Sequence, residues 1–342
     1  MEKILKITLC VFLFLGFFGC KESKLNIYNW EGHIDLDLVA KFEKEYKCKV
    51  TIDTFRTLDA FYNDMTTATR TKKYDVLVPR ANIARKMYEE KMLRMIDHSK
   101  MPNLRNIAMS FIKRSPDATM RYSVPYMITL TGIAYNRNMI KDFKPSWTMF
   151  ARDDLAGKIG MLDDMREVVG AALKVNSISY NATDDNQLRT AEVTLGKWKK
   201  NIKKIDSAKD IEADLKSGEL YMIQDYNGNA LNLVKGNNNI GFVIPEEGTA
   251  INIDTFVIPF EAENIDEAYK FINFFLDAEI SKENMQFLSY YAPNLAAQRL
   301  LNDDFKKNPA INPSQDTILR SDYLIDLDDI GKYEELWRMM KR

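Results

Sequence analysis

The stretch LNIYNWEGHIDLDLVAKFEKEYKCKVTIDTF, residues 25–55, decides the fold. Residues 25–30 are typical of a β-strand, and residues 49–55 alternate apolar and polar side chains as a second strand does. Between them, Asp35 can cap a helix whose apolar side chains recur at helical spacing, namely Leu38, Val39, Phe42 and Tyr46. The stretch therefore predicts a strand, a helix and another strand.

The alternation of strands and helices continues beyond this stretch. Residues 59–69 favour a helix, and YDVLVP, residues 74–79, predicts an apolar strand closed by proline. Strands that alternate with helices predict a mostly parallel, doubly wound sheet. Such sheets bind ligands at the carboxyl ends of their strands, where we expect Trp30 and Arg80 to lie.

A second block, from about residue 132 to residue 250, again mixes helices and short strands. We expect helices over 167–174 and 187–200, short strands over 157–162 and 220–223, a buried strand over 253–259 and a closing helix over 268–276. No segment has the composition of a disordered linker, so the connections between the two blocks are expected to be short.

The first residues predict export. Residues 1–6 are basic and residues 7–19 form an apolar run, which is typical of a signal peptide and too short for a membrane span. The run ends in LGFFG before Cys20, which loosely matches a bacterial lipobox. We therefore expect a lipid on Cys20, followed by a tether over 20–24. An ordinary signal peptide cut elsewhere and an uncleaved anchor stay open as alternatives.

Composition limits the function further. Without residues 1–19 the chain keeps 323 of its 342 residues, which suits two domains. Its 48 Lys and Arg residues balance 49 Asp and Glu residues, so it lacks the basic footprint of a nucleic-acid-binding protein. With Cys10 in the leader and Cys20 lipidated, Cys48 has no disulfide partner and is interpreted as a small buried hydrophobe at the start of a strand.

The sequence carries none of the common catalytic or metal-binding motifs. His33 and His98 are its two histidines, neither in a zinc-type spacing, and both are interpreted as ordinary surface residues. We find no nucleophile elbow, no phosphate-binding glycine loop and no dinucleotide fingerprint. The sequence therefore predicts no catalytic residue, no metal and no cofactor, although paired carboxylates alone can hydrolyse glycosides.

Seven short strings, in this order, resemble the periplasmic spermidine/putrescine-binding proteins of polyamine import systems. They are YNW at 28–30, YDVLVP at 74–79, VPY at 124–126, DDMREV at 163–168, YNGNA at 226–230, IDTFVIP at 253–259 and PNLAA at 293–297. The resemblance implies a two-lobed periplasmic-binding-protein fold of type II, an α/β fold in which each lobe is a mostly parallel sheet flanked by helices. Lobe 1 would take 25–129 plus 254–297 and lobe 2 the remainder, 130–253 plus 298–342, with crossovers near 129–132 and 250–254 and a ligand cleft between the lobes.

The resemblance also implies the ligand-binding residues, which are Trp30, Asp164, Glu167, Tyr226, Asp254 and Tyr290. A polyamine is a chain of ammonium groups joined by methylenes, so carboxylates suit its charges and aromatic faces suit both charge and stem. Glu31 is an extra acid beside Trp30 and joins the candidate site.

Each candidate also has a structural interpretation. Asp164 and Glu167 have the spacing of a helix N-cap and its reciprocal acid. Asp254, in an apolar strand, is suited to a cation from a ligand or from the protein itself. The three aromatic residues could belong to the core.

The chain departs from the family pattern at three positions near the candidate site. Asn252 stands where relatives have Trp, His33 where they have Tyr, and Arg80 where a small hydroxyl residue is usual. These departures bear on the identity of the ligand more than on the fold. In particular, Arg80 adds a positive charge that must point away from the site or be paired within it.

Taken with the resemblance, the sequence predicts a monomeric solute-binding protein of an ABC importer. It would be lipid-anchored on the periplasmic or cell-surface side of the membrane, capture putrescine or spermidine, and deliver it to permease subunits. One alternative is a related binding protein for another small ligand, such as an amino acid derivative. The other is a carbohydrate-active enzyme that uses Asp164 and Glu167.

Overall fold

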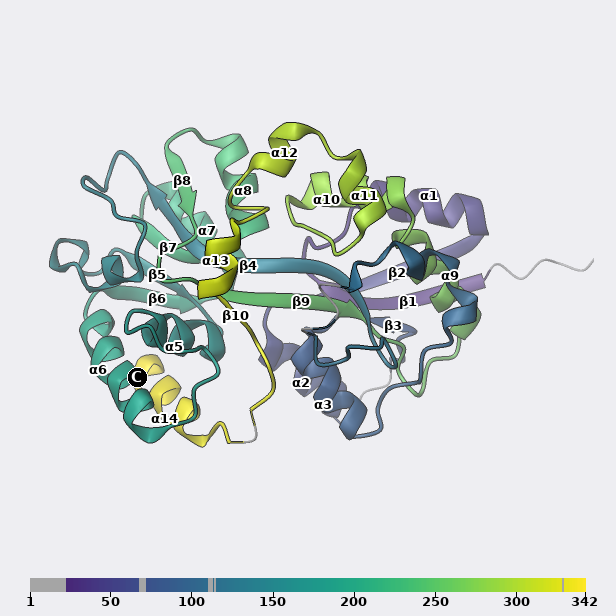
Figure 1. The fold of residues 1–342 in the computed structure, drawn as a ribbon, viewed down its shortest axis with the longest axis horizontal. Helices are drawn as coiled ribbons and strands as arrows, with labels where there is room; N and C mark the ends of the chain where they lie inside the picture. Colours follow the sequence, from purple (N-terminus) through teal and green to yellow (C-terminus); the bar gives the residue numbers. More distant parts are fainter. Residues whose placement is uncertain (1–22, 68–71, 110–112, 114, 328) are drawn as a thin grey trace, which may run out of the picture.

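The computed structural model describes residues 23–67, 72–109, 113, 115–327 and 329–342. Two lobes lie next to each other and are joined by strands that run from one into the other (Figure 1). The expected signal peptide and the lipid site at Cys20 lie outside the described residues. The first strand already begins at Ser23, so the end of the expected tether belongs to a sheet.

The first lobe is built on a three-stranded parallel sheet in the order β2-β1-β3. Its strands are β1 (Ser23–Trp30), β2 (Cys48–Phe55) and β3 (Val76–Leu77). All three lie within or overlap segments where the sequence predicts strands. Because they are parallel, their carboxyl ends meet at one edge of the sheet, the edge expected to bind ligand.

The helices of the first lobe form where local signals favour them. Helix α1 begins after Asp35, whose side chain accepts the N–H of Asp37, and it ends at Lys47 in the left-handed conformation with φ 51°. The set comprises α1 (Leu36–Tyr46), α2 (Leu58–Thr66), α3 (Ala81–Glu89), α9 (Ile265–Phe275), α10 (Ala278–Leu288) and α11 (Leu295–Leu300).

The second sheet has the order β10-β9-β4-β7-β5-β6, and β8 also pairs with β4. Its strands are β4 (Val124–Asn136), β5 (Ile159–Leu162), β6 (Ile202–Asp206), β7 (Met222–Tyr226), β8 (Ile240–Val243), β9 (Ala250–Phe256) and β10 (Asp322–Tyr323). The expectation of a mostly parallel sheet does not hold here. The sheet is mixed, because β4 pairs antiparallel with β7, β8 and β9.

Helices pack around this second sheet, and several short helices connect the elements. The α-helices are α5 (Met165–Lys174), α6 (Asp185–Lys199), α7 (Ala208–Ser217), α8 (Asn227–Gly236), α13 (Gln315–Arg320) and α14 (Gly331–Lys341). Helix α12 (Asp303–Lys307) instead packs Phe305 against the hydrophobic core of the first lobe. Short 3-10 helices occupy His98–Lys100, Pro102–Asn106, Trp147–Ala151 and Asp153–Leu155.

Residues 124–130 of β4 pair with residues 251–256 of β9, and the two strands connect the lobes (Figure 1). At one end Val124 and Phe256 lie in the hydrophobic core of the first lobe, and at the other Ile133 and Ala250 lie in that of the second. The crossovers implied by the resemblance fall within these two strands. The residue boundaries of the lobes stay a prediction.

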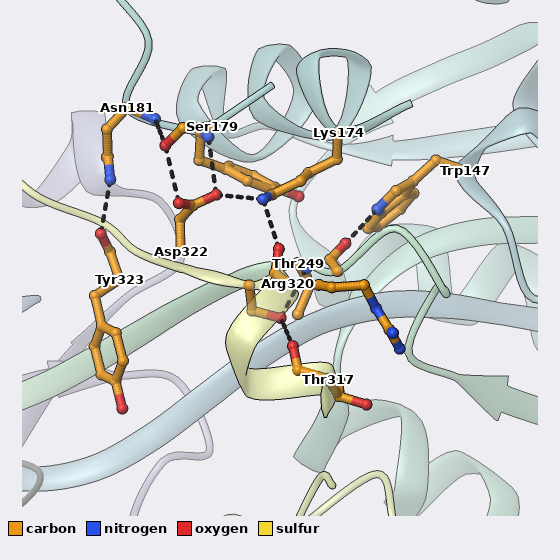
Figure 2. A network of polar contacts seen from close by, with 12 residues as sticks. Trp147, Lys174, Ser179, Asn181, Thr249, Thr317, Arg320, Asp322 and Tyr323 are labelled. Atoms are coloured by element: carbon orange, nitrogen blue, oxygen red, sulfur yellow. Dashed lines mark hydrogen bonds and ion pairs between the residues drawn. The ribbon is translucent and has the colours of Figure 1, made fainter. Parts of the chain in front are cut away.

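A polar network fastens the segment around β10 to the second lobe (Figure 2). Lys174 Nζ lies 2.6 Å from Asp322 Oδ2 and donates to the carbonyl oxygen of Arg320, also at 2.6 Å. Ser179 Oγ donates to Asp322 Oδ1 at 2.9 Å, and Asn181 donates to the carbonyl of Tyr323. These bonds hold β10 against the end of β9, next to the crossing strands.

Two further findings concern Cys48 and the membrane. Cys48 is 2% exposed at the start of β2, and burial raises the pKa of its thiol, which confirms its interpretation as a small buried hydrophobe. In the part of the chain that the structure describes, no helix combines the length and the apolar character needed to span a membrane.

Candidate functional site

The candidate site lies between the lobes, at the strand ends where the sequence predicts it. Trp30 is the last residue of β1, and Arg80 follows β3 and begins α3. The backbone of Arg80 forms a β-bridge with Asp254 of β9. Three chain segments that are distant in sequence therefore present their side chains to the same space.

The second lobe contributes the first turn of α5. Asp164 caps this helix, because its Oδ1 accepts the N–H groups of Arg166 at 3.1 Å and Glu167 at 3.2 Å. The capping interpretation of Asp164 is thus confirmed, and its Oδ2 is left to face the cleft. Glu167 is fully buried, and its Oε1 accepts a hydrogen bond from Asn252 Nδ2 at 2.7 Å.

Arg80 crosses from the first lobe into the second and is 3% exposed. Its Nη1 lies 2.6 Å from Asp164 Oδ2 and 3.8 Å from Glu167 Oε1. Its Nη2 donates to Tyr226 Oη at 2.6 Å. The guanidinium carbon lies 5.6 Å from the ring centroid of Trp30 and 5.3 Å from that of Tyr226. The positive charge that the sequence placed here is therefore paired within the site.

Burial and charge act in opposite directions on these groups. Burial alone would lower the pKa of Arg80, but Tyr226 and the carboxylates of Asp164 and Glu167 raise it well above its usual range. Burial raises the pKa of Glu167 to about 7, although the charge of Arg80 works to lower it. Arg80 therefore stays positively charged, and its charge partly offsets the effect of burial on the pKa of Glu167.

A cavity of about 80 Å³ lies beside this cluster. Its inner wall includes Trp30, His33, Thr129, Asn229, Asp254 and Tyr290. At its mouth, Glu31 accepts a hydrogen bond from Arg56 Nε at 2.5 Å and also contacts Lys209 of the second lobe. Both lobes therefore contribute to the wall of the cavity and to the ion pairs at its rim.

His33 is part of this wall, so its interpretation as a surface residue is wrong. The side chain is buried, and its Nε2 lies 3.2 Å from Asp254 Oδ2. The cause is the turn after β1, where Gly32 takes φ +71° and the N–H of His33 bonds back to the carbonyl of Trp30. This turn directs the imidazole inward onto the ring of Tyr290, with a centroid distance of 5.0 Å. His98, in contrast, is exposed as expected.

Asn252 is not among the residues that line the 80 Å³ cavity. It is 2% exposed and contributes to a separate space of about 10 Å³, and its amide binds Glu167. Where the resemblance leads one to expect an indole, this chain thus places a hydrogen-bond donor to a buried carboxylate.

The structure brings the seven sequence-predicted residues into one region, although in different positions. Five of them line the 80 Å³ cavity: Trp30, Glu31, Tyr226, Asp254 and Tyr290. Asp164 borders a neighbouring space of about 10 Å³, and Glu167 lies behind it, against Arg80 and Asn252. Ligand contact by each of these residues stays a prediction.

Several residues that line the cavity were not among the predicted site residues, including His33, Lys209 and Asn229. For His33 the available signal was its position just after Trp30. Asn229 lies within the string YNGNA at 226–230, which supports the resemblance, but it was not singled out. Lys209 gave no signal, because lysine is a common surface residue type. In the described ranges no group of three or more His, Cys, Asp or Glu side chains is placed to hold a metal ion.

Two α/β lobes joined by crossing strands, with a partly apolar cavity between them, define a two-lobed solute-binding protein. The chain belongs to the bacterial extracellular solute-binding protein family, and the sequence pattern of that family matches residues 37–313. This is a family of binding proteins and not of enzymes, so the carbohydrate-active alternative gains no support from it.

Individual relatives agree with this assignment over nearly the whole chain. The spermidine/putrescine-binding periplasmic protein of Salmonella typhimurium is 30% identical over 94% of this chain and 92% of its own. A putative spermidine/putrescine ABC transporter structure from Listeria monocytogenes has a TM-score of 0.86 and 31% identity, covering 93% of this chain and 99% of its own. The TpPotD lipoprotein of Treponema pallidum has a TM-score of 0.82 and 29% identity, covering 93% and 99%.

Proposed function

We propose that this protein is the extracytoplasmic solute-binding component of an ABC importer, which captures a polyamine between its lobes and delivers it to permease subunits. The observation that carries the proposal is Asp254, an acid that is 3% exposed and faces a cavity walled by Trp30 and Tyr290. The names of its relatives, which bind spermidine or putrescine, support the same ligand class. The protein acts by binding and not by catalysis.

The chemistry of the cavity suits an alkylammonium group. A carboxylate withdrawn from water is costly unless a cation or hydrogen-bond donor compensates it, and an ammonium group can do both. Aromatic faces beside it attract a cation by roughly 0.5–2 kcal/mol each and also cover a methylene stem. A neutral sugar carries no positive charge for Asp254, and its hydroxyls would have to be desolvated. An acidic amino acid carries one ammonium group, but also two carboxylates that would have to be desolvated near Asp254.

The first prediction is that putrescine or spermidine raises the melting temperature of the purified protein, whereas maltose and glutamate do not. A ligand that binds only the folded state stabilises it by about 2.7 kcal/mol at a hundredfold excess over Kd. Differential scanning fluorimetry followed by calorimetry measures the effect. If no amine shifts the melt at millimolar concentration, the polyamine assignment fails, and a shift with an amino acid derivative alone would favour the alternative ligand class.

We further propose that Cys20 carries a lipid that anchors the protein, as the lipoprotein from Treponema pallidum leads one to expect. The second prediction is that Cys20→Ser abolishes acyl labelling in cells and moves the protein from the membrane fraction to the soluble fraction. Cys48→Ser, which alters a buried cysteine of β2, is the control and should leave acyl labelling intact. Wild-type protein without acyl label would contradict the anchor.

We propose that the protein works as a monomer, because a single chain supplies both walls of the cavity and the ion pairs at its mouth. Light scattering behind a sizing column measures this, and a stable dimer at micromolar concentration would contradict it.

A further inference from the structure

Arg80 has the surroundings that a ligand's ammonium group would need. Two carboxylates, Asp164 and Glu167, face its guanidinium, and the hydroxyl of Tyr226 accepts from it. The rings of Trp30 and Tyr226 lie at cation–π distance from it. Four of the residues that the family resemblance assigns to the ligand therefore contact a cation that belongs to the protein itself.

The space left in the cleft agrees with this. The cavity at Asp254 measures about 80 Å³, which holds several water-sized groups. The space that borders Asp164 measures about 10 Å³, close to the minimum for one water molecule. Glu167 has no exposed surface. The cleft therefore offers room for a ligand at Asp254 and almost none at the Asp164–Glu167 pair.

The charges that line the 80 Å³ cavity point the same way. Two acids line it, Glu31 and Asp254, together with three bases, Arg56, Arg80 and Lys209. Glu31 already contacts both Arg56 and Lys209. Among the described residues of this wall, Asp254 is the one acid without a Lys or Arg partner, and its Oδ2 lies 3.2 Å from His33 Nε2. Each additional ammonium group on a ligand would thus approach the positive charges of the wall, and like charges repel.

We propose that Arg80 permanently occupies one cation subsite of this cleft, so that the protein recognises an alkylamine by a single ammonium group held at Asp254. This rests on the proposed function and narrows its ligand class. A second ammonium group of the ligand would have to displace a guanidinium that the chain holds in place at a high effective concentration. Arg80 is therefore the specificity-determining residue, and it sets how many positive charges of a ligand contribute to affinity.

The wild-type protein tests this with three ligands that share a four-carbon amine end. N-acetylputrescine, putrescine and spermidine carry one, two and three positive charges at neutral pH. The proposal expects their Kd values, measured by calorimetry, to lie within about threefold of one another. Spermidine binding ten times more tightly than N-acetylputrescine would overturn it.

Arg80→Met gives the matching gain of function. It removes the internal cation but keeps an apolar stem, so the two carboxylates become available to a ligand. Spermidine should then bind at least tenfold more tightly than N-acetylputrescine, which corresponds to about 1.4 kcal/mol. The control is Arg85→Met on the same helix, an exposed residue that pairs with Glu89 at 2.9 Å, and it should keep the wild-type ratio.

The outcomes distinguish a failure of the role proposed for Arg80 from a failure of the proposed polyamine-binding function. If spermidine and N-acetylputrescine keep the same ratio in folded Arg80→Met as in the wild type, Arg80 does not occupy an ammonium subsite, while the polyamine function stands. If none of the three amines binds either protein, the proposed function itself fails, and the inference fails with it.

Discussion

Asp254→Asn is expected to weaken amine binding by about thirtyfold to a thousandfold or more. The carboxylate is 3% exposed and lines the 80 Å³ cavity, whereas Asp164 is paired to Arg80 and Glu31 is paired to Arg56 and Lys209. Truncating one partner of a buried charge pair typically costs about 2–5 kcal/mol, and 1.4 kcal/mol is tenfold in Kd. Calorimetry with putrescine measures the loss.

Two controls separate the loss of an ammonium partner from a general defect. Asp266→Asn alters an exposed acid of α9 that pairs with Lys100 at 2.6 Å, and it should bind putrescine as the wild type does. Thermal melts of Asp254→Asn should stay cooperative, because the amide has nearly the size of the carboxylate and can keep its place beside His33. Unchanged affinity in a folded Asp254→Asn variant would mean that the ammonium group binds elsewhere, and the single-ammonium inference would then be wrong as well.

The fold was predictable where local pattern and local structure coincide. Strand β1 follows from the strand-like composition of residues 25–30, and helix α1 from the cap at Asp35 and the apolar spacing after it, all of which are properties of neighbouring residues. The antiparallel pairing of β4 with three strands was not predictable in the same way. It depends on hydrogen bonds between segments about 90 to 130 residues apart, and a strand has the same periodicity in a parallel and in an antiparallel sheet.

The residue types of the site were predictable, but the directions in which their side chains point were not. Asp254 attracted attention because an acid in an apolar strand needs a partner, and it does lie in the cavity wall. Arg80 was recognised as a charge that had to be paired or turned outward, and the sequence could not decide between the two. That choice depends on Asp164 and Tyr226, which belong to the other lobe and are brought near only when the chain has folded. His33 was misinterpreted because its burial depends on the backbone turn at Gly32.

Two helical glycines of the second lobe should respond to alanine in opposite directions. Gly170 lies in α5, the helix that presents Asp164 and Glu167, and a Cβ there would meet the ring of fully buried Tyr180 at 1.8 Å. Gly196 lies on an exposed position of α6, where a Cβ meets nothing within 4 Å. Alanine is the better helix former by about 1 kcal/mol at either position, so packing decides the difference.

Gly170→Ala is therefore expected to lower the free energy of unfolding by about 2 kcal/mol or more, since overpacking typically costs about 1–3 kcal/mol and this overlap is severe. The ring cannot move aside easily, because the backbone of Tyr180 is held by Asp322 and by the hydroxyl of Tyr333. Gly196→Ala should instead raise that free energy by about 0.4–1 kcal/mol. Urea unfolding of the wild type and both variants measures these changes in the free energy of unfolding. A Gly170→Ala variant as stable as Gly196→Ala would show that α5 and Tyr180 do not pack as described.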